Sequence, residues 1–154
     1  MNTNEELRNA LLDYLNNPQT HKSLLDAVED FPEDKINDKP AGAPYSFWEQ
    51  LEHIRICQWD MIDFMVDQNY EERKWPKDYW PKPGEKADKR MWNESISKFE
   101  ADYEQLKKVV QDNSFDLFAI IPHGSGQSTI REVLQIIDHN SYHIGQFVLL
   151  RKLI

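Results

Sequence analysis

The sequence predicts an all-α protein, a bundle of helices without a sheet. Four segments repeat apolar residues every three or four positions, the spacing of one face of an α-helix. Three of them begin at a Ser/Thr-x-x-Glu sequence, which is typical of a capping box at a helix start. The sequence has no pair of segments in which apolar and polar residues alternate, as they do in strands. A four-helix bundle is therefore expected. The length of 154 residues predicts a single domain over residues 1–154.

The first helical segment is expected in two pieces. It begins near Asn4, with a capping box at Thr3, and Pro18 interrupts it. It resumes after Thr20, a candidate N-cap, and ends before Pro32. The apolar positions that define it are Leu7, Leu11, Leu12, Leu15, Leu24, Leu25 and Val28.

The second segment follows a loop. Residues 32–45 contain Pro and Gly with few large apolar side chains, so they predict an ordered crossover loop. Ser46 and Glu49 then form a capping box, and the helix behind it is expected to end near Asp67. Its apolar positions are Phe47, Leu51, Ile54, Cys57, Met61, Phe64 and Met65.

A long aromatic loop separates the second and third segments. Residues 68–88 hold Trp75, Tyr79 and Trp80 beside several prolines, and three large aromatic rings are costly to leave in water. The loop is therefore expected to fold over the body as a lid or an interface, with Trp75 and Trp80 covering a pocket. The third helix ends near Asp112 and carries Trp92, Ile96, Phe99, Tyr103, Leu106 and Val110 on its apolar face.

The last helix follows a short extended connection. Residues 115–121 are apolar, but they have no partner run and are closed by Pro122 and Gly124, so no sheet is expected. A capping box at Thr129 predicts the start of a final helix that continues toward Ile154. Its apolar positions are Ile130, Val133, Leu134, Ile137, Ile144, Phe147 and Val148.

The composition excludes several classes of function. There are 18 Lys and Arg against 27 Asp and Glu, a net charge of −9, which argues against a nucleic-acid partner. The N-terminal residues lack the basic and apolar regions of a signal peptide, and no run is long enough to span a membrane, so a cytoplasmic location is expected. Cys57 is the only cysteine, so any metal must be bound mainly by the five histidines.

Three of the histidines are candidate metal ligands. His139 and His143 are four residues apart and therefore share one face of the last helix, at the edge of its apolar arc. His53 lies at the border of the apolar stripe of the second helix. Three neutral imidazoles with one open position form a catalytic type of divalent-metal site. The competing interpretation is that all three are satisfied or solvated helix histidines.

Several other polar residues have both a functional and a structural interpretation. Asp60 and Glu49 flank the histidine of the second helix, and each is either a hydrogen-bond acceptor or base at the site or a solvated carboxylate. Cys57 offers a thiolate or is a small core residue. His123 follows Pro122 in a loop and suits the surface better than a site, and His21 is expected at the surface.

Two longer strings resemble a known family. They are Trp48-Glu-Gln-Leu-Glu-His53-Ile-Arg-Ile-Cys-Gln-Trp-Asp60 and Asp138-His-Asn-Ser-Tyr-His-Ile-Gly-Gln146, with the Trp-Pro loop between them. The chain resembles the DinB-like metalloenzyme superfamily, which includes YfiT-type proteins and bacillithiol transferases, over nearly its whole length. The resemblance implies an up-down-down-up four-helix bundle, a homodimer, and nickel, zinc or a similar divalent ion bound by His53, His139 and His143.

The function expected from the resemblance is metal-dependent chemistry on a small molecule. Characterised relatives transfer or isomerise with low-molecular-weight thiols, so thiol S-transfer is the first hypothesis and metal-dependent hydrolysis the second. A noncatalytic bundle that binds a metal or a small ligand is the rival from another class. The acidic composition gives no reason to expect a DNA activity despite the family's name.

Overall fold

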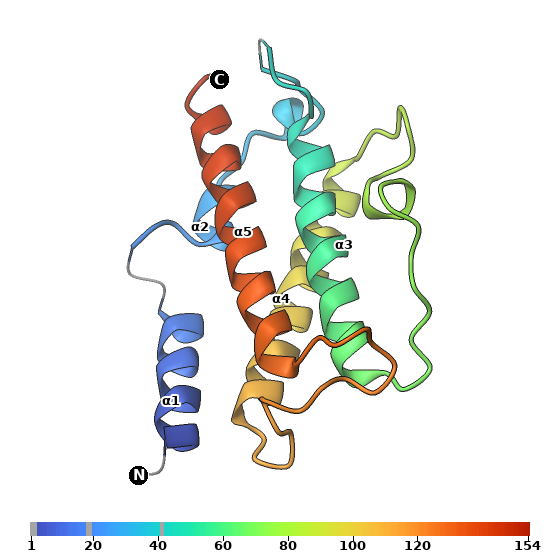
Figure 1. Ribbon diagram of the computed structural model, residues 1–154. Helices are drawn as coiled ribbons and strands as arrows, with labels where there is room; N and C mark the ends of the chain where they lie inside the picture. Colours follow the sequence, from blue (N-terminus) through green and yellow to red (C-terminus); the bar gives the residue numbers. More distant parts are fainter. Residues whose placement is uncertain (1–2, 18–19, 41) are drawn as a thin grey trace.

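The computed structural model describes residues 3–17, 20–40 and 42–154, and these residues form a helical protein (Figure 1). Its helices are α1 (Thr3–Asn16), α2 (Leu24–Val28), α3 (Phe47–Val66), α4 (Lys89–Gln111) and α5 (Thr129–Arg151). Two single-turn 3₁₀ helices, Glu33–Lys35 and Lys77–Tyr79, lie in the loops. The described residues contain no strand, only an isolated bridge between Ile120 and Ser128. The all-α prediction is confirmed.

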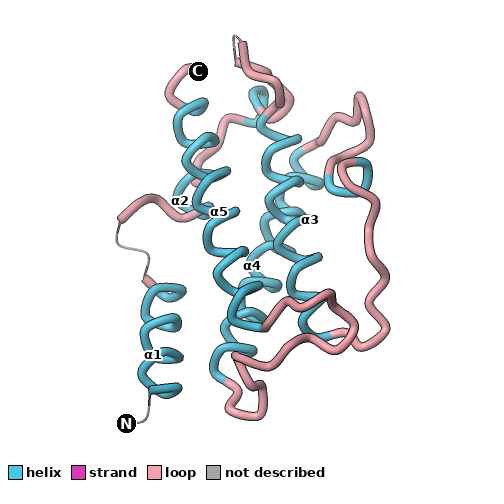
Figure 2. Tube along the Cα trace, in the orientation of Figure 1, coloured by secondary structure: helices cyan, strands magenta, loops and turns pink. Residues whose placement is uncertain are grey.

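The helices run up, down, down and up, as the family resemblance implied. In Figure 1, α1 and α2 rise from the N-terminus, α3 and α4 both descend, and α5 rises to the C-terminus. Helix α3 packs against both α4 and α5, and α1 packs against α4. Because α3 and α4 are parallel, the chain must return along the outside of the bundle between them, and residues 67–88 do so in an extended loop (Figure 2).

The predicted cap residue agrees with the structure for α3 and differs for α1, α2 and α5. Ser46 and Glu49 form the predicted reciprocal capping box, with Ser46 Oγ accepting from Glu49 N at 3.1 Å and Glu49 accepting from Ser46 N at 2.7 Å. Thr20 is not the cap of α2, because Ser23 caps it through Asp26.

Thr129 is likewise not the N-cap of α5. It is the first helical residue, and Ser128 occupies the cap position without a side-chain hydrogen bond. Helix α1 begins at Thr3, one residue before the predicted start near Asn4, so Thr3 is a helical residue and not the predicted cap. The predicted break at Pro18 lies outside the described residues. Helix α5 ends at Arg151, before Ile154.

The core consists of two apolar clusters. In one, Phe47 packs edge-on against Phe31 and Phe147, with ring centroids 4.8 and 5.2 Å apart. The other joins α1, α3, α4 and α5 around Leu106 and Ile136, which are fully buried. Each cluster removes several large side chains from water, which stabilises the α3–α5 packing on which the site depends. Among the described residues, no helix is long and apolar enough to cross a membrane.

Candidate metal centre

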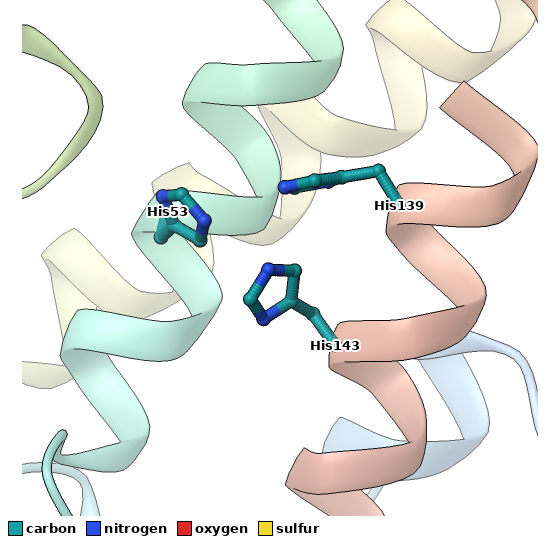
Figure 3. Close-up of side chains that lie close together, drawn as sticks. All are labelled: His53, His139 and His143. Atoms are coloured by element: carbon teal, nitrogen blue, oxygen red, sulfur yellow. The ribbon is translucent and has the colours of Figure 1, made fainter. Parts of the chain in front are cut away.

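The three histidines predicted as ligands lie together between α3 and α5. His53 points from the first half of α3 toward His139 and His143, which project from adjacent turns of α5 (Figure 3). The ring centroid of His53 is 5.2 Å from that of His139 and 4.7 Å from that of His143, and the two α5 rings are 4.5 Å apart. One nitrogen from each ring lies within 4.8 Å of the others. Two nitrogens at zinc-binding distance in a tetrahedron are about 3.3 Å apart, so small side-chain rotations bring the set to that geometry.

The environment keeps these imidazoles neutral at pH 7. Burial, with a smaller contribution from His143 and His53, lowers the pKa of His139 to about 3. Burial and the neighbouring His53 lower the pKa of His143 to about 4, and burial lowers the pKa of His53. A neutral ring keeps one nitrogen lone pair, and this is the form that binds a metal ion.

Hydrogen bonds at Nδ1 orient two of the rings. His53 Nδ1 is 2.7 Å from the Tyr79 carbonyl oxygen, which can only accept, so Nδ1 carries the proton and Nε2 keeps the lone pair. His143 Nδ1 is 3.1 Å from Oε1 of Gln146, one turn further along α5. In metal sites such partners fix the ring orientation and the tautomer of each histidine ligand. These contacts leave Nε2 of both rings available to a metal.

A comparison with protein families matches residues 18–147 to the DinB superfamily, which covers most of the chain. The chain belongs to the DinB superfamily. Comparisons with curated proteins and with solved structures found no match. Membership of this superfamily and the three-histidine cluster fit a metal-binding protein.

Aromatic rings cover one side of the histidine cluster of this DinB superfamily protein. Trp80 stacks flat on His53, with centroids 3.9 Å apart and ring planes within 4°, and Tyr45 stacks on the outer face of Trp80 at 4.0 Å. Trp75 is 6.4 Å from His53 and 68% exposed. Trp80 therefore covers the site as the sequence predicted, whereas Trp75 stands at its rim.

Asp60 is a buried anchor for the loop of residues 67–88. Its carboxylate accepts hydrogen bonds from the hydroxyl groups of Tyr70 at 3.0 Å and Tyr79 at 2.6 Å, and it is paired with Arg73. The same Tyr79 presents its carbonyl to His53. Asp60 is thus neither a solvated carboxylate nor a free base, because its oxygens hold the loop segment that orients His53.

The other polar candidates of the sequence lie outside the cluster. Glu49 belongs to the α3 capping box and pairs with Lys39 at 3.0 Å. Cys57 is buried, its Sγ 3.5 Å from His53 Nδ1, and burial together with the charge of Asp60 raises its pKa to about 12. A thiol that holds its proton so firmly behaves as a small core residue.

His123 and His21 also lie away from the cluster. His123 Nε2 contacts the Phe64 carbonyl oxygen at 2.8 Å. His21 is exposed beside the Tyr14 hydroxyl, as expected for a surface histidine.

Sequence reasoning missed the groups that support the histidines. Gln146 follows His143 by three residues, which on a helix places the two side chains on one face. This contact could therefore have been predicted from the sequence. The contact of the Tyr79 carbonyl oxygen with His53 could not have been predicted, because its position depends on the path of an irregular loop. A polar pocket of about 400 Å³ adjoins this support, with Asp60, Tyr79 and Glu132 among its lining residues.

Proposed function

We propose that His53, His139 and His143 bind one divalent metal ion, nickel or zinc, and that the protein uses it to transfer a low-molecular-weight thiol to an electrophile. The observation that carries the proposal is the convergence of three neutral imidazoles from two helices. Among the described residues no fourth His, Cys, Asp or Glu joins the set. Three protein ligands and one open position are typical of catalytic rather than structural zinc sites.

The donor set suits activation of a thiol. When bound, a divalent ion would supply a Lewis acid that lowers the pKa of a thiol or water at its open position. Because His53, His139 and His143 are neutral, they leave the positive charge of the site uncompensated, which favours an anionic sulfur over a neutral one. Trp80 shields His53 from water, which strengthens electrostatic interactions on that side of the site.

The engagement of Asp60, the carboxylate that the sequence offered as a base, supports thiol transfer over hydrolysis. Attack by water benefits from a carboxylate or imidazole that takes up its proton. The nearest buried carboxylate on α3, Asp60, already accepts hydrogen bonds from Tyr70, Tyr79 and Arg73. A thiol needs less help because its pKa is already close to neutrality.

The same observation supports the rival hypothesis of a noncatalytic protein that binds a metal or a small ligand. Such a protein needs the three histidines and the aromatic cover but no base. It predicts stoichiometric binding without turnover of any substrate.

We also propose that two copies associate through α5. Leu134, Tyr142 and Leu149 repeat at seven- and eight-residue spacing on one face of this helix and are 52–63% exposed. An apolar stripe of this kind marks protein interaction surfaces. Sedimentation equilibrium should give a dimer for the wild type and a monomer for Leu149→Glu. A monomeric wild type contradicts the proposal.

Metal content tests the ligand assignment. Purified protein loaded with zinc or nickel and desalted should retain about one ion per chain, whereas His139→Ala should lose it. His21→Ala is the matched control, since it removes an exposed histidine outside the cluster. A His139→Ala protein that keeps stoichiometric metal overturns the assignment.

Turnover tests the reaction. Metal-loaded protein is assayed with a panel of low-molecular-weight thiols against an aryl halide and an epoxide, and separately with ester and amide substrates. Thiol consumption that depends on His139 supports the transferase. Ester or amide cleavage without thiol consumption favours the hydrolase, and binding without any turnover favours the noncatalytic rival.

A further inference from the structure

A cavity of about 430 Å³ opens where the first helical segment is divided into α1 and α2 (Figure 1). Helix α1 ends at Asn16 and packs against α4, whereas α2 begins at Leu24 and packs against α5. All four helices and the segment between α1 and α2 contribute lining residues, and we call this space the α1–α2 cavity. None of the three clustered histidines is among its lining residues, so it is separate from the candidate metal centre.

The floor of the α1–α2 cavity, its buried lining residues, is mainly apolar. Leu15, Leu24, Phe99, Asn140 and Ile144 form it, and each is at most 6% exposed. Leu15 belongs to one of the two core clusters, and Leu24, Phe99 and Ile144 belong to the other. The cavity therefore lies where the two clusters meet. Its volume and its apolar floor are typical of small-molecule pockets, which hold roughly 300 to 1,000 Å³.

Hydrogen-bonding groups meet at the rim of the cavity, which comprises its half-buried and exposed lining residues. Tyr14 Oη and Ser141 Oγ each lie 3.3 Å from His21 Nε2. His21 Nδ1 is 2.8 Å from the Lys22 carbonyl oxygen, so Nδ1 carries a proton and Nε2 of the neutral ring is an acceptor. The Tyr14 hydroxyl therefore donates to His21, while Ser141 donates to the Ile137 carbonyl oxygen at 2.7 Å. The two hydroxyl oxygens keep lone pairs, and none of the three side chains has a hydrogen left for a ligand.

The charged residues of the rim are mostly acidic. Asp26, Glu100 and Glu104 line the cavity together with one Lys, Lys107. Lys107 pairs with Glu104, with Nζ 2.7 Å from Oε1. The Glu100 carboxylate makes no ion pair with another described residue. The charge of the rim therefore favours a cationic group on the ligand.

We propose that the α1–α2 cavity binds an amphipathic amine, a small aromatic or aliphatic body that carries one ammonium group. The body packs on the floor against Leu15, Phe99 and Ile144, and the ammonium group lies at the rim near Glu100. An ammonium group only donates hydrogen bonds, so it suits the hydroxyl oxygens of the rim and the free carboxylate. A carboxylate on the same body only accepts, and it is repelled by Glu100. The site is independent of the proposed metal.

Two probes of similar shape and opposite charge test the ligand class. The full-length ¹⁵N-labelled chain is titrated with naphthylethylamine and, separately, with naphthylacetate, and binding is followed by amide chemical shifts. The amine should bind saturably, about tenfold or more tightly than the acetate, and should shift residues of the cavity such as Leu24, Tyr103 and Ser141. Amine shifts confined to other residues, equal affinities for the two probes, or no saturable binding of the amine overturn the proposal.

A variant that fills the cavity tests the location. Ser141→Phe places a ring at the rim and should weaken amine binding by about tenfold or more. Gln135→Phe is the matched control, since Gln135 is exposed on the same helix and lies outside the cavity. It should bind the amine as the wild type does. Undiminished binding to a folded Ser141→Phe protein, with circular dichroism as the check on folding, overturns the assignment.

A charge reversal separates the site from general attraction to an acidic protein. Glu100→Lys and Glu94→Lys change the net charge equally and both lie at exposed positions of α4, but Glu94 is outside the cavity. Glu100→Lys should weaken amine binding by about tenfold and strengthen acetate binding, whereas Glu94→Lys should change neither by more than about twofold. Equal effects of the two substitutions overturn the proposal. Because Glu100 is exposed, this test remains valid if Ser141→Phe fails to fold.

Discussion

Acid should destabilise the metal-free protein through its buried histidines, and His139→Gln should remove part of that effect. In the unfolded chain the His139 imidazole has the ordinary pKa of 6.5, whereas in the folded protein burial lowers it to about 3. Between these two values the unfolded chain binds a proton that the folded chain excludes. The free energy of unfolding therefore falls as the pH falls below 6.5 and stops falling, for this group, near pH 3.

The magnitude follows from the size of the shift. A pH of 5 is about 1.5 units below the pKa of the imidazole in the unfolded chain. Each unit stabilises the protonated unfolded chain by about 1.4 kcal/mol, so the free energy of unfolding falls by about 2 kcal/mol. A typical domain has only about 5 to 15 kcal/mol of stability, so a loss of this size is readily measured.

The assay is urea denaturation followed by circular dichroism between about pH 7 and about pH 5, in the presence of a chelator. His139→Gln is compared with His21→Gln, which also removes one imidazole from the unfolded chain but lies outside the cluster. His139→Gln should lose about 2 kcal/mol less than His21→Gln over this range. Equal losses in the two variants would refute the argument that His139 is held neutral by burial.

Three further predictions concern the loop, the thiol and the helix cap. Tyr79→Phe removes the hydroxyl that Asp60 accepts at 2.6 Å, and it should lower the free energy of unfolding by about 1.5 to 3 kcal/mol in urea denaturation; a loss within error of zero contradicts the anchoring role. Cys57, whose pKa is raised to about 12 by burial, should resist a thiol-specific reagent in the native protein and react once urea unfolds it, and equal rates in the two states would show that it is accessible. Ser46→Ala breaks the α3 capping box and should cost about 1 kcal/mol, whereas Ser128→Ala, at a cap without a side-chain bond, should cost clearly less; equal thermal midpoints would contradict this.

Local sequence patterns predicted a helix start correctly where only one candidate cap residue lies near it. Ser46 is the only Ser or Thr near the start of α3, and both the start and the end of that helix were predicted within one residue. At α5, Ser128 and Thr129 are both plausible caps. Thr129 is buried and its amide bonds to the Ala119 carbonyl oxygen, so packing of the preceding loop decides which residue enters the helix. A choice made by tertiary contacts leaves no local signal.

Some features of the candidate site also follow from local spacing in the sequence, whereas others depend on tertiary packing. His139 and His143 are brought together by helical spacing alone, so their proximity is readable from the sequence. The meeting of His53 with them depends on α3 packing against α5, which apolar patterning favours and the family resemblance implied. The partner of His53 is a backbone oxygen of Tyr79, and a backbone group carries no residue-type signal at all.

The loop that orients His53 exists for a topological reason. Helix α3 has 20 residues and is about 30 Å long, and because α4 runs parallel to it the chain must cover that distance again before α4 begins. An extended chain needs only about 9 residues for this. Residues 67–88 are more than twice as many, and the surplus forms the 3₁₀ turn that presents Tyr79 and Trp80 to His53. Asp60 fixes this turn through the Tyr79 hydroxyl, from a position two helical turns beyond His53 on the same helix. The connection that parallel helices require therefore also covers and orients one ligand of the proposed metal site.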